Sequence, residues 1–250
     1  MIERLSRSCL FIGQRCIGQR SIGKRRIGQR CQDAPSLNYN GHLTQGKAAM
    51  TTTIYGLSGS RAIRSLWAIE ETGIEYTHVP THFFKDSKTP EYLAINPNGR
   101  IPALVDGDEM LFESMAINLY LTRKYAPQLH PENDLDLART MQWSVWAISE
   151  IEPLQMQIVV QKFFTGGNAD QTIIDNAAEQ LDRPLKVLDA HLQNTDYLVG
   201  TTFSVADLNL AGVMLLLQMV QFDLSSYANV SGWLSRCYER EALKRAQALD

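Results

Sequence analysis

The pattern of apolar residues changes once along this chain, and the change limits the folds open to it. Residues 51–125 alternate short β-prone runs with helical stretches, whereas no convincing strand follows the proline-containing segment 126–133. A length of 250 residues suits one large or two small domains. The sequence therefore predicts a mixed α/β domain over residues 50–128 and an all-α domain over residues 134–250.

The α/β domain is predicted from short elements bounded by turn residues. Apolar residues recur at i, i+3, i+4 and i+7 from Ala62, and Gly73 is a natural helix end. A tight turn at residues 106–108 joins two strands into a hairpin. The expected strands are residues 52–55, 75–79, 101–105 and 110–112. The expected helical pieces are residues 62–70, capped by Ser58 or Ser60, then 90–95, and 114–125, capped by Ser114.

The second domain reads as helices throughout. The predicted helices are residues 135–164, 173–192, 204–220, 230–238 and 242–249. Proline removes a backbone donor, so we expect a kink in the first of these helices at Pro153. The run 208–220 is too short for a membrane span and contains Asn209 and Gln218, so it indicates a buried helix and no membrane association.

The first 49 residues differ from the rest in both charge and repetition. They carry nine basic and two acidic residues, a net charge of +7, and residues 12–31 repeat an Ile-Gly-containing unit of five. At 100° per residue the isoleucines spread around a helix, so no amphipathic transit peptide forms. An RNA-binding arm is the less favoured alternative. Our hypothesis is that residues 1–49 are a basic pentapeptide-repeat extension that is disordered or non-native, and that the natural chain starts at Met50.

The remaining residues exclude several function classes. Residues 50–250 carry a net charge of −10, which argues against nucleic acid as the main partner. They contain one cysteine, Cys237, so they can form neither a disulfide framework nor a cysteine-rich zinc site, and a reducing, cytoplasmic location is expected. His78 and His82 are separated by Pro80, which disfavours a metal pair on a helix. For these reasons no metal is expected. No phosphate-binding glycine motif is present, so no nucleotide cofactor is expected either.

Two motifs point to a binding site. In the stretch 96–104, Asn-Pro-Asn-Gly-Arg-Ile-Pro-Ala-Leu, Pro102 stands directly before a buried strand. A cis bond there would expose the backbone groups of Ile101 to a partner, although a plain turn is an equal alternative. Glu113 and Ser114 follow a strand at a helix start, where free N–H groups can bind an anion. On its own this second motif is more simply a helix cap.

Together with the order of elements, these motifs resemble the cytosolic glutathione S-transferase family, of a bacterial-looking, serine-type class. The similarity covers residues 51–250, and its most specific signals are the stretch 96–104 and the Phe-Glu-Ser segment 112–114. Residues 197–200 and 203–207 resemble the capping-box signature of the family, in which Asp207 bonds back to the Ser204 cap. The resemblance implies a thioredoxin-like N-terminal domain, an all-helical C-terminal domain, and a detoxifying transferase that is a homodimer.

The resemblance also implies roles for individual residues. Ile101, before cis Pro102, pairs its backbone with the cysteinyl part of glutathione, and Glu113 and Ser114 hold the γ-glutamyl group. The loop with Arg100 and Asn98 reaches the tripeptide. The face formed by Trp143, Trp146 and Glu150 lines an apolar pocket for the second substrate, with a core stripe as an equal alternative.

The residue that activates the thiol stays open among several candidates. Ser60 is favoured over Ser58, Tyr55 follows, backbone N–H groups alone are a further alternative, and Arg61 adds positive charge. A hydrogen bond to the sulfur would lower the pKa of the glutathione thiol. The expected reaction is conjugation of glutathione to a small hydrophobic electrophile. Alternatives are glutathione-dependent dehalogenation, isomerisation or peroxidase chemistry, or a non-catalytic stress-response module, because fold does not dictate function.

Overall fold

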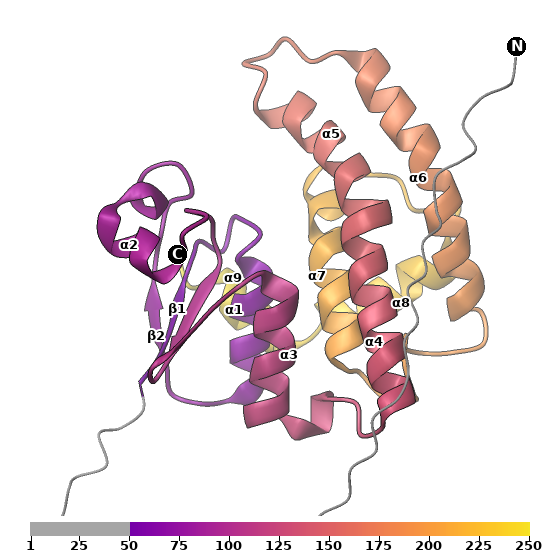
Figure 1. Ribbon diagram of the computed structural model, residues 1–250. Helices are drawn as coiled ribbons and strands as arrows, with labels where there is room; N and C mark the ends of the chain where they lie inside the picture. Colours follow the sequence, from indigo (N-terminus) through magenta and orange to yellow (C-terminus); the bar gives the residue numbers. More distant parts are fainter. Residues whose placement is uncertain (1–50) are drawn as a thin grey trace, which may run out of the picture. The chain divides into compact units, whose positions relative to one another are not determined.

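The computed structural model describes residues 51–250, shown as coloured ribbon in Figure 1. The hypotheses for residues 1–49 lie outside the described residues. The first part holds a four-stranded mixed sheet of β1 (Thr52–Tyr55), β2 (Thr77–Val79), β3 (Ala103–Asp106) and β4 (Glu109–Phe112), in the order β2-β1-β3-β4. Strand β1 is parallel to β2 and antiparallel to β3. All four strands predicted from the sequence are confirmed, with ends shifted by one or two residues.

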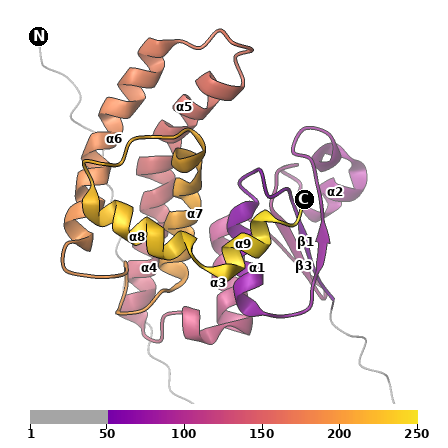
Figure 2. The same ribbon diagram turned by 180° about the vertical axis from the view of Figure 1, so that it is seen from behind.

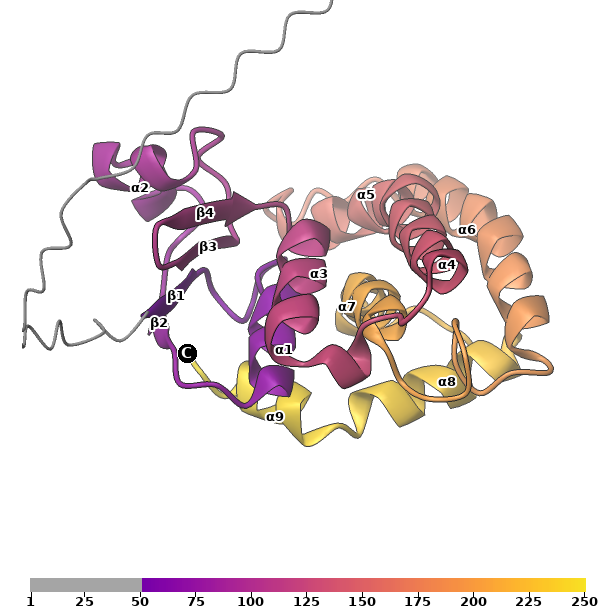
Figure 3. The ribbon, with the colours of Figure 1, turned by 60° about the horizontal axis from the view of Figure 1, so that its bottom comes forward.

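Helices cover both faces of this sheet. Helix α1 (Ile63–Thr72) and helix α3 (Ser114–Tyr125) pack together on one face, and α2 (Pro90–Ile95) lies on the other (Figure 3). Gly73 ends α1 with φ 68°, a left-handed conformation that glycine adopts without strain. Buried Ile54 of β1, Leu104 of β3 and Leu66 of α1 belong to the hydrophobic core. The predicted thioredoxin-like arrangement is confirmed.

The second part contains only helices among the described residues. They are α4 (Asp134–Trp146), α5 (Glu152–Phe163), α6 (Gln171–Leu192), α7 (Val205–Met219), α8 (Ala228–Tyr238) and α9 (Glu241–Gln247). The interruption predicted at Pro153 is present as a π-helical turn, Ala147–Ile151, that joins α4 to α5. A proline in the first turn of α5 cannot donate to the preceding turn, which widens there. None of the helices in residues 51–250 combines the length and apolar character needed to cross a membrane.

Helix α9 leaves the helical part and packs on α1, beside the sheet domain (Figure 2). Two ion pairs hold it there. The guanidinium of Arg240 contacts both carboxylate oxygens of Glu71, and Arg245 Nε lies 2.6 Å from Glu70 Oε2. The end of the chain therefore stabilises the first helix of the fold.

Two helix starts differ from their predictions. Helix α1 begins after Ala62, with no side-chain cap of its own, although Ser60 Oγ accepts a hydrogen bond from the Ala62 N–H at 3.1 Å. Ser114 is the first residue of α3 and not its cap; the cap position belongs to Glu113. In both cases the chain enters the helix through a turn that sequence spacing alone does not resolve.

The predicted capping box at the start of α7 is confirmed. Asp207 Oδ2 accepts from the N–H of Ser204 at 2.9 Å, and its Oδ1 accepts from Leu198 N at 2.8 Å and Trp233 Nε1 at 2.9 Å. Burial raises the pKa of this carboxyl, and the donors act in the opposite direction. One side chain thus joins the start of α7, the preceding loop and α8.

We expect Asp207→Asn to destabilise the protein by about 2 kcal/mol, because the amide NH2 would face two donors and leave them unsatisfied. Urea unfolding monitored by circular dichroism measures the change. Asp175→Asn is the matched control, since Asp175 is exposed on α6 and accepts only a local bond from Gln171. Equal stability of the two variants would contradict this account of Asp207.

Candidate functional site

Strand register brings three loops to one edge of the sheet. Tyr55 pairs with Ala103, and Ala103 pairs with Phe112, so the segments that follow β1, precede β3 and follow β4 are neighbours. Gly56 begins the first of these loops with φ 149°, and a Cβ built on it would lie 2.2 Å from Ala62 Cβ and 3.7 Å from Ile101 Cβ. Only glycine fits this close approach. The loop before α1 is therefore held against the loop before β3.

The two candidate serines of the first loop differ in their hydrogen bonds. Ser60 Oγ accepts from the Ala62 N–H and donates to the Leu57 carbonyl at 2.7 Å. Ser58 is held by Asp250: its N–H donates to Asp250 Oδ1 at 2.9 Å and its hydroxyl to the Asp250 carbonyl at 3.4 Å. The C-terminal residue thus holds one serine, while the partners of the other lie within its own loop.

Tyr55, the third candidate, packs within the sheet domain. Its ring meets that of Tyr92 on α2 edge to face, with centroids 5.8 Å apart. Tyr92 in turn donates its hydroxyl to the Arg100 carbonyl at 2.7 Å. Tyr55 therefore contacts the loop before β3 indirectly, through Tyr92.

The loop before β3 contains the cis peptide bond expected between Ile101 and Pro102. Asn96 Nδ2 also donates to the Arg100 carbonyl, at 2.7 Å, and Asn96 Oδ1 accepts from the N–H of Asn98 at 3.1 Å. The Asn96 side chain thus stabilises the loop through hydrogen bonds to its backbone. The side chains of Asn98 and Arg100 are exposed. The outer surface of the loop is free to contact a ligand.

The start of α3 is backbone-strained. Glu113 has φ 70° and ψ 112°, which is rare for a residue other than glycine, and its side chain is exposed. Ser114, almost buried, begins the helix, and its carbonyl accepts from Ser65 Oγ of α1 at 3.5 Å. The first N–H groups of α3 have no intrahelical acceptor. Strain of this kind concentrates at functional sites, which supports an anion-binding role for this turn.

A charged cluster links α1 to α5. Glu152 pairs with Arg61 through Nε and with Arg64, whose Nη1 lies 3.0 Å from Glu152 Oε2. Arg64 is 3% exposed and Arg61 47%. Desolvation lowers the pKa of Arg64, against the opposing charge of Glu152. Two cations and one anion leave a net positive charge beside the serine loop.

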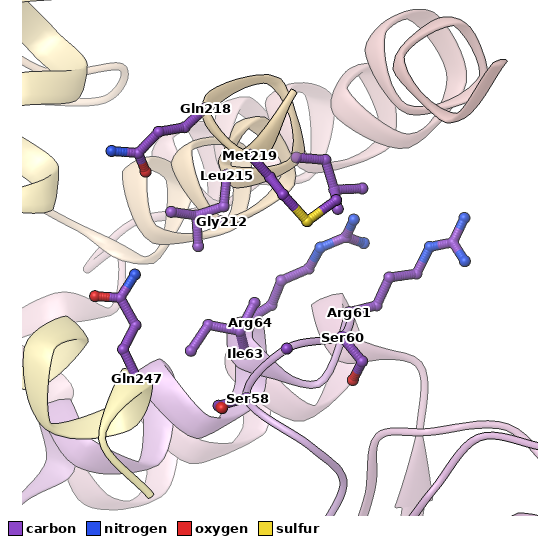
Figure 4. Close-up of a pocket in the computed structure, with 12 residues that line it drawn as sticks. Ser58, Ser60, Arg61, Ile63, Arg64, Gly212, Leu215, Gln218, Met219 and Gln247 are labelled. Atoms are coloured by element: carbon purple, nitrogen blue, oxygen red, sulfur yellow. The ribbon is translucent and has the colours of Figure 1, made fainter. Parts of the chain in front are cut away.

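A cavity of about 250 Å³ lies between the serine loop, α1, the C-terminal half of α7 and the end of α9 (Figure 4). Its walls combine apolar side chains of α7 with polar groups of the loop and of α1. They are formed by Ser58, Gly59, Ser60, Arg61, Ile63, Arg64, Gly212, Leu215, Leu216, Gln218, Met219 and Gln247. The cavity thus unites Ser58, Ser60 and Arg61 of the predicted site with residues from the far end of the chain.

Trp143, Trp146 and Glu150 do not line this cavity, and their contacts agree with the equal alternative of a core stripe. Trp143 is buried, packs on Trp146 with ring centroids 5.2 Å apart, and lies 4.7 Å from the ring of His191 on α6. Glu150 forms an ion pair with Arg183, also on α6. The periodicity correctly identified one helix face, but that face packs against α6.

Sequence analysis missed Arg64, Glu152 and Asp250. Arg64, in the first turn of α1, follows Arg61 of the preceding turn by three residues, and this pair of arginines could have been noticed. Gly212 inside the apolar helix α7 is a second signal, because a Cβ there would lie 3.2 Å from Arg64 Cγ. No local pattern predicts the contact of Asp250 with Ser58, since 192 residues separate them.

Comparisons with known proteins agree with this arrangement. The family model for the glutathione S-transferase N-terminal domain matches residues 50–123, and that for the C-terminal domain matches residues 151–241. Glutathione S-transferase 1 of Zea mays is 37% identical over 196 residues, which cover 74% of this chain and 90% of the maize protein.

Two solved structures carry ligands. The theta class glutathione S-transferase from Xanthomonas axonopodis pv. citri with glutathione bound has a TM-score of 0.75 and 29% identity, covering 80% of this chain and 99% of that one. Maize glutathione S-transferase I in complex with an atrazine glutathione conjugate has a TM-score of 0.73 and 35% identity, covering 80% and 97%. Glutathione is bound in the first of these structures and a glutathione conjugate in the second.

The charged cluster generates a prediction about stability and pH. Burial alone would raise the pKa of Glu152, but Arg64 and Arg61 outweigh it, and the pKa is lowered from its ordinary 4.5. The ionised carboxylate therefore contributes stability above pH 4.5, and this contribution is lost as the pH falls through the lower, folded-state pKa. We expect Glu152→Gln to cost about 3–5 kcal/mol at pH 7, because it leaves Arg64 buried and unpaired.

Urea unfolding of wild type and Glu152→Gln across pH 7 to 3 tests this expectation, and the difference between them should narrow below pH 4.5. Glu132→Gln, at an exposed position, is the control and should track the wild type. A difference that stays constant with pH would show that the charge of Glu152 is not what stabilises the fold.

Proposed function

The chain belongs to the glutathione S-transferase family, and we propose that Ser60 is the group in this member that holds the thiolate of glutathione. The enzyme conjugates glutathione, its co-substrate, to small hydrophobic electrophiles. The single observation that carries the assignment of Ser60 is the pattern of hydrogen bonds around its hydroxyl. This pattern distinguishes Ser60 from Ser58 in the same loop.

The Ala62 N–H donates to one of the two lone pairs of Ser60 Oγ and so fixes the position of this oxygen, while the O–H bond can still rotate. The hydroxyl proton points to the Leu57 carbonyl, and rotation about one bond turns it to a sulfur placed beside the loop. Ser58, in contrast, is held at both its N–H and its hydroxyl by Asp250. Ser60 also lies at the positive end of α1, where a thiolate is stabilised.

The other residues of the candidate site would surround this thiolate. Ile101, before cis Pro102, offers its backbone to the cysteinyl unit, as an added strand would. Glu113 takes the γ-glutamyl amine, Ser114 and the free N–H groups of α3 take its carboxylate, and Arg100 reaches the tripeptide from its exposed position. The strand register supports this grouping, because Tyr55, Ala103 and Phe112 are neighbours across the sheet.

The reaction itself needs a positioned thiolate and an electrophile. The sulfur forms a bond to the electrophilic carbon, and the leaving group departs with its electron pair or the electrophile takes up a proton. Ser60 donates a hydrogen bond to the sulfur and so lowers the pKa of the glutathione thiol. The charged cluster of Arg61, Arg64 and Glu152 has a net positive charge, which lowers this pKa further. Leu215, Leu216 and Met219 of α7 form the apolar wall for the second substrate.

Conjugation of a chlorodinitrobenzene tests the assignment of Ser60. We expect Ser60→Ala to lose about 100-fold in kcat/KM, because a hydrogen bond of roughly 3 kcal/mol in the transition state disappears. Ser58→Ala is the matched control, with an expected loss below about 5-fold. The pKa seen in the pH profile of kcat/KM should rise in Ser60→Ala alone, while calorimetry still detects glutathione binding. A loss confined to Ser58→Ala would reverse the assignment.

We also propose that the protein is a cytoplasmic homodimer. Leu137, Met141 and Val145 recur every four residues on α4 with exposed side chains, and Phe84, Met110 and Phe112 are exposed on the sheet domain. Exposed apolar side chains of this kind mark interfaces. In a two-fold dimer the α4 side chains of each subunit would contact the sheet-domain side chains of the other. Cys237, the one cysteine after residue 31, is a buried free thiol, which suits a reducing compartment.

Met141→Glu tests the dimer. A charge placed in an apolar interface should raise the dimer dissociation constant by roughly 100-fold. Sedimentation velocity across a concentration series measures the shift from dimer to monomer. Val187→Glu, at an exposed apolar position of α6, is the control and should stay dimeric. A wild-type protein that sediments as a monomer at all concentrations would overturn the proposal.

A further inference from the structure

Arg64 is the least expected charge in the molecule. It lies on α1 with 3% of its side chain exposed, and only its Nη1 has an acceptor, Glu152 Oε2 at 3.0 Å. Its Nε and Nη2 are buried without any hydrogen-bond partner among the described residues. These two nitrogens form one edge of the guanidinium, the edge that binds the paired oxygens of a carboxylate.

The charge balance around this edge calls for another anion. Arg61 and Arg64 share the single carboxylate of Glu152. Glu113 is the other acid that acts on Arg64, and we have assigned its side chain to the amine of glutathione. A buried donor without an acceptor costs free energy, and an ionised one costs more. A ligand carboxylate would satisfy both the charge and the two donors.

Arg64 is also part of the cavity wall. Figure 4 shows its side chain extending from α1 toward α7, and Arg61 running in the same direction. Leu215, Leu216 and Met219 make the opposite wall apolar. Met219 is exposed and flexible enough to move aside for a ligand. The cavity thus offers an apolar surface beside Arg64, and the unpaired Nε and Nη2 of Arg64 are covered by neighbouring side chains that a ligand would have to displace.

We propose that the second substrate of this transferase is a hydrophobic electrophile that carries a carboxylate, and that the Nε/Nη2 edge of Arg64 binds this carboxylate. The inference rests on the proposed function, because it places the second substrate beside Ser60. It adds the class of substrate: an aryl or alkenyl acid rather than a neutral hydrophobe. Arg64 is here a specificity-determining residue and takes no part in the bond-making step.

A matched pair of electrophiles tests the proposal on the full chain. The acid is para-chloro-meta-nitrobenzoate, and the neutral partner is its methyl ester. In both, the thiolate sulfur bonds to the ring carbon, chloride leaves with its electron pair, and the thiol proton goes to solvent. The ester reacts faster without enzyme, so each kcat/KM is divided by the rate constant for the uncatalysed reaction with glutathione. We expect this normalised value to be at least 10-fold higher for the acid, the size of one charge-assisted hydrogen bond.

Variants connect the preference to Arg64. Arg64→Lys keeps the charge that Glu152 requires but removes the two-nitrogen edge, and the acid-to-ester ratio should fall to about 1. Arg139→Lys, at an exposed arginine of α4 paired with Asp136, is the control and should keep the wild-type ratio. A wild-type ratio of 1 or below, in an enzyme that conjugates the ester, would overturn the inference and leave the proposed function intact.

A binding measurement separates the remaining outcomes and does not depend on turnover. Calorimetry compares the unreactive para-methyl-meta-nitrobenzoate with the matching amide, and tighter binding of the acid to wild type but not to Arg64→Lys supports the site. The acid should compete with the electrophile and bind together with glutathione. If it instead displaces glutathione, the edge holds a carboxylate of glutathione and the inference is wrong. Equal binding of acid and amide would also overturn it.

Discussion

The ion pair of the buried Arg64 guanidinium with Glu152 is the interaction that most constrains the packing of the helices around α1. The guanidinium projects from α1, a helix packed by α3, α7 and α9, so its charge is removed from water. A buried cation is tolerated only with a partner, and Glu152 in the first turn of α5 provides it. The helix opposite must also leave space, which explains Gly212 in the middle of the apolar helix α7. One charge therefore sets constraints on three helices that are far apart in the sequence.

The same helix connects this cluster to the sheet edge where we propose that glutathione binds. Ser60 stands at the start of α1, and the register of β1, β3 and β4 brings the loops with Ile101 and Glu113 to the same edge. Ser65 on α1 hydrogen-bonds to the first residue of α3. The positive helix end, the exposed backbone before Pro102 and the strained start of α3 are thus positioned by regular elements, which hold a site more rigidly than loops alone.

Much of this could be predicted from the sequence, because the fold depends on local patterns. Alternating short strands, Gly73 as a helix end, the Pro102 motif and the Ser204 capping box each have a signature within ten residues. The features that the sequence left open depend on tertiary packing. The stripe containing Trp143 and Glu150 is a real helix face, but periodicity does not say which neighbour it packs against, and α6 covers it. Arg64 and Glu152, separated by 88 residues, are paired only by the fold.

The hydrogen bonds between Ser58 and Asp250 join the serine loop of the sheet domain to the residue that follows α9. The sheet domain supplies the loop, but the segment that contacts it follows α9, which is anchored on α1 through Glu70 and Glu71. These partners oppose local opening of α9, so the order of the serine loop depends on the stability of the C-terminal helix. Because Gln247 also lines the cavity, a change that loosens α9 alters the loop and the pocket wall together. Helix α1 therefore contacts both the loop proposed to hold the thiolate and the cavity proposed for the second substrate.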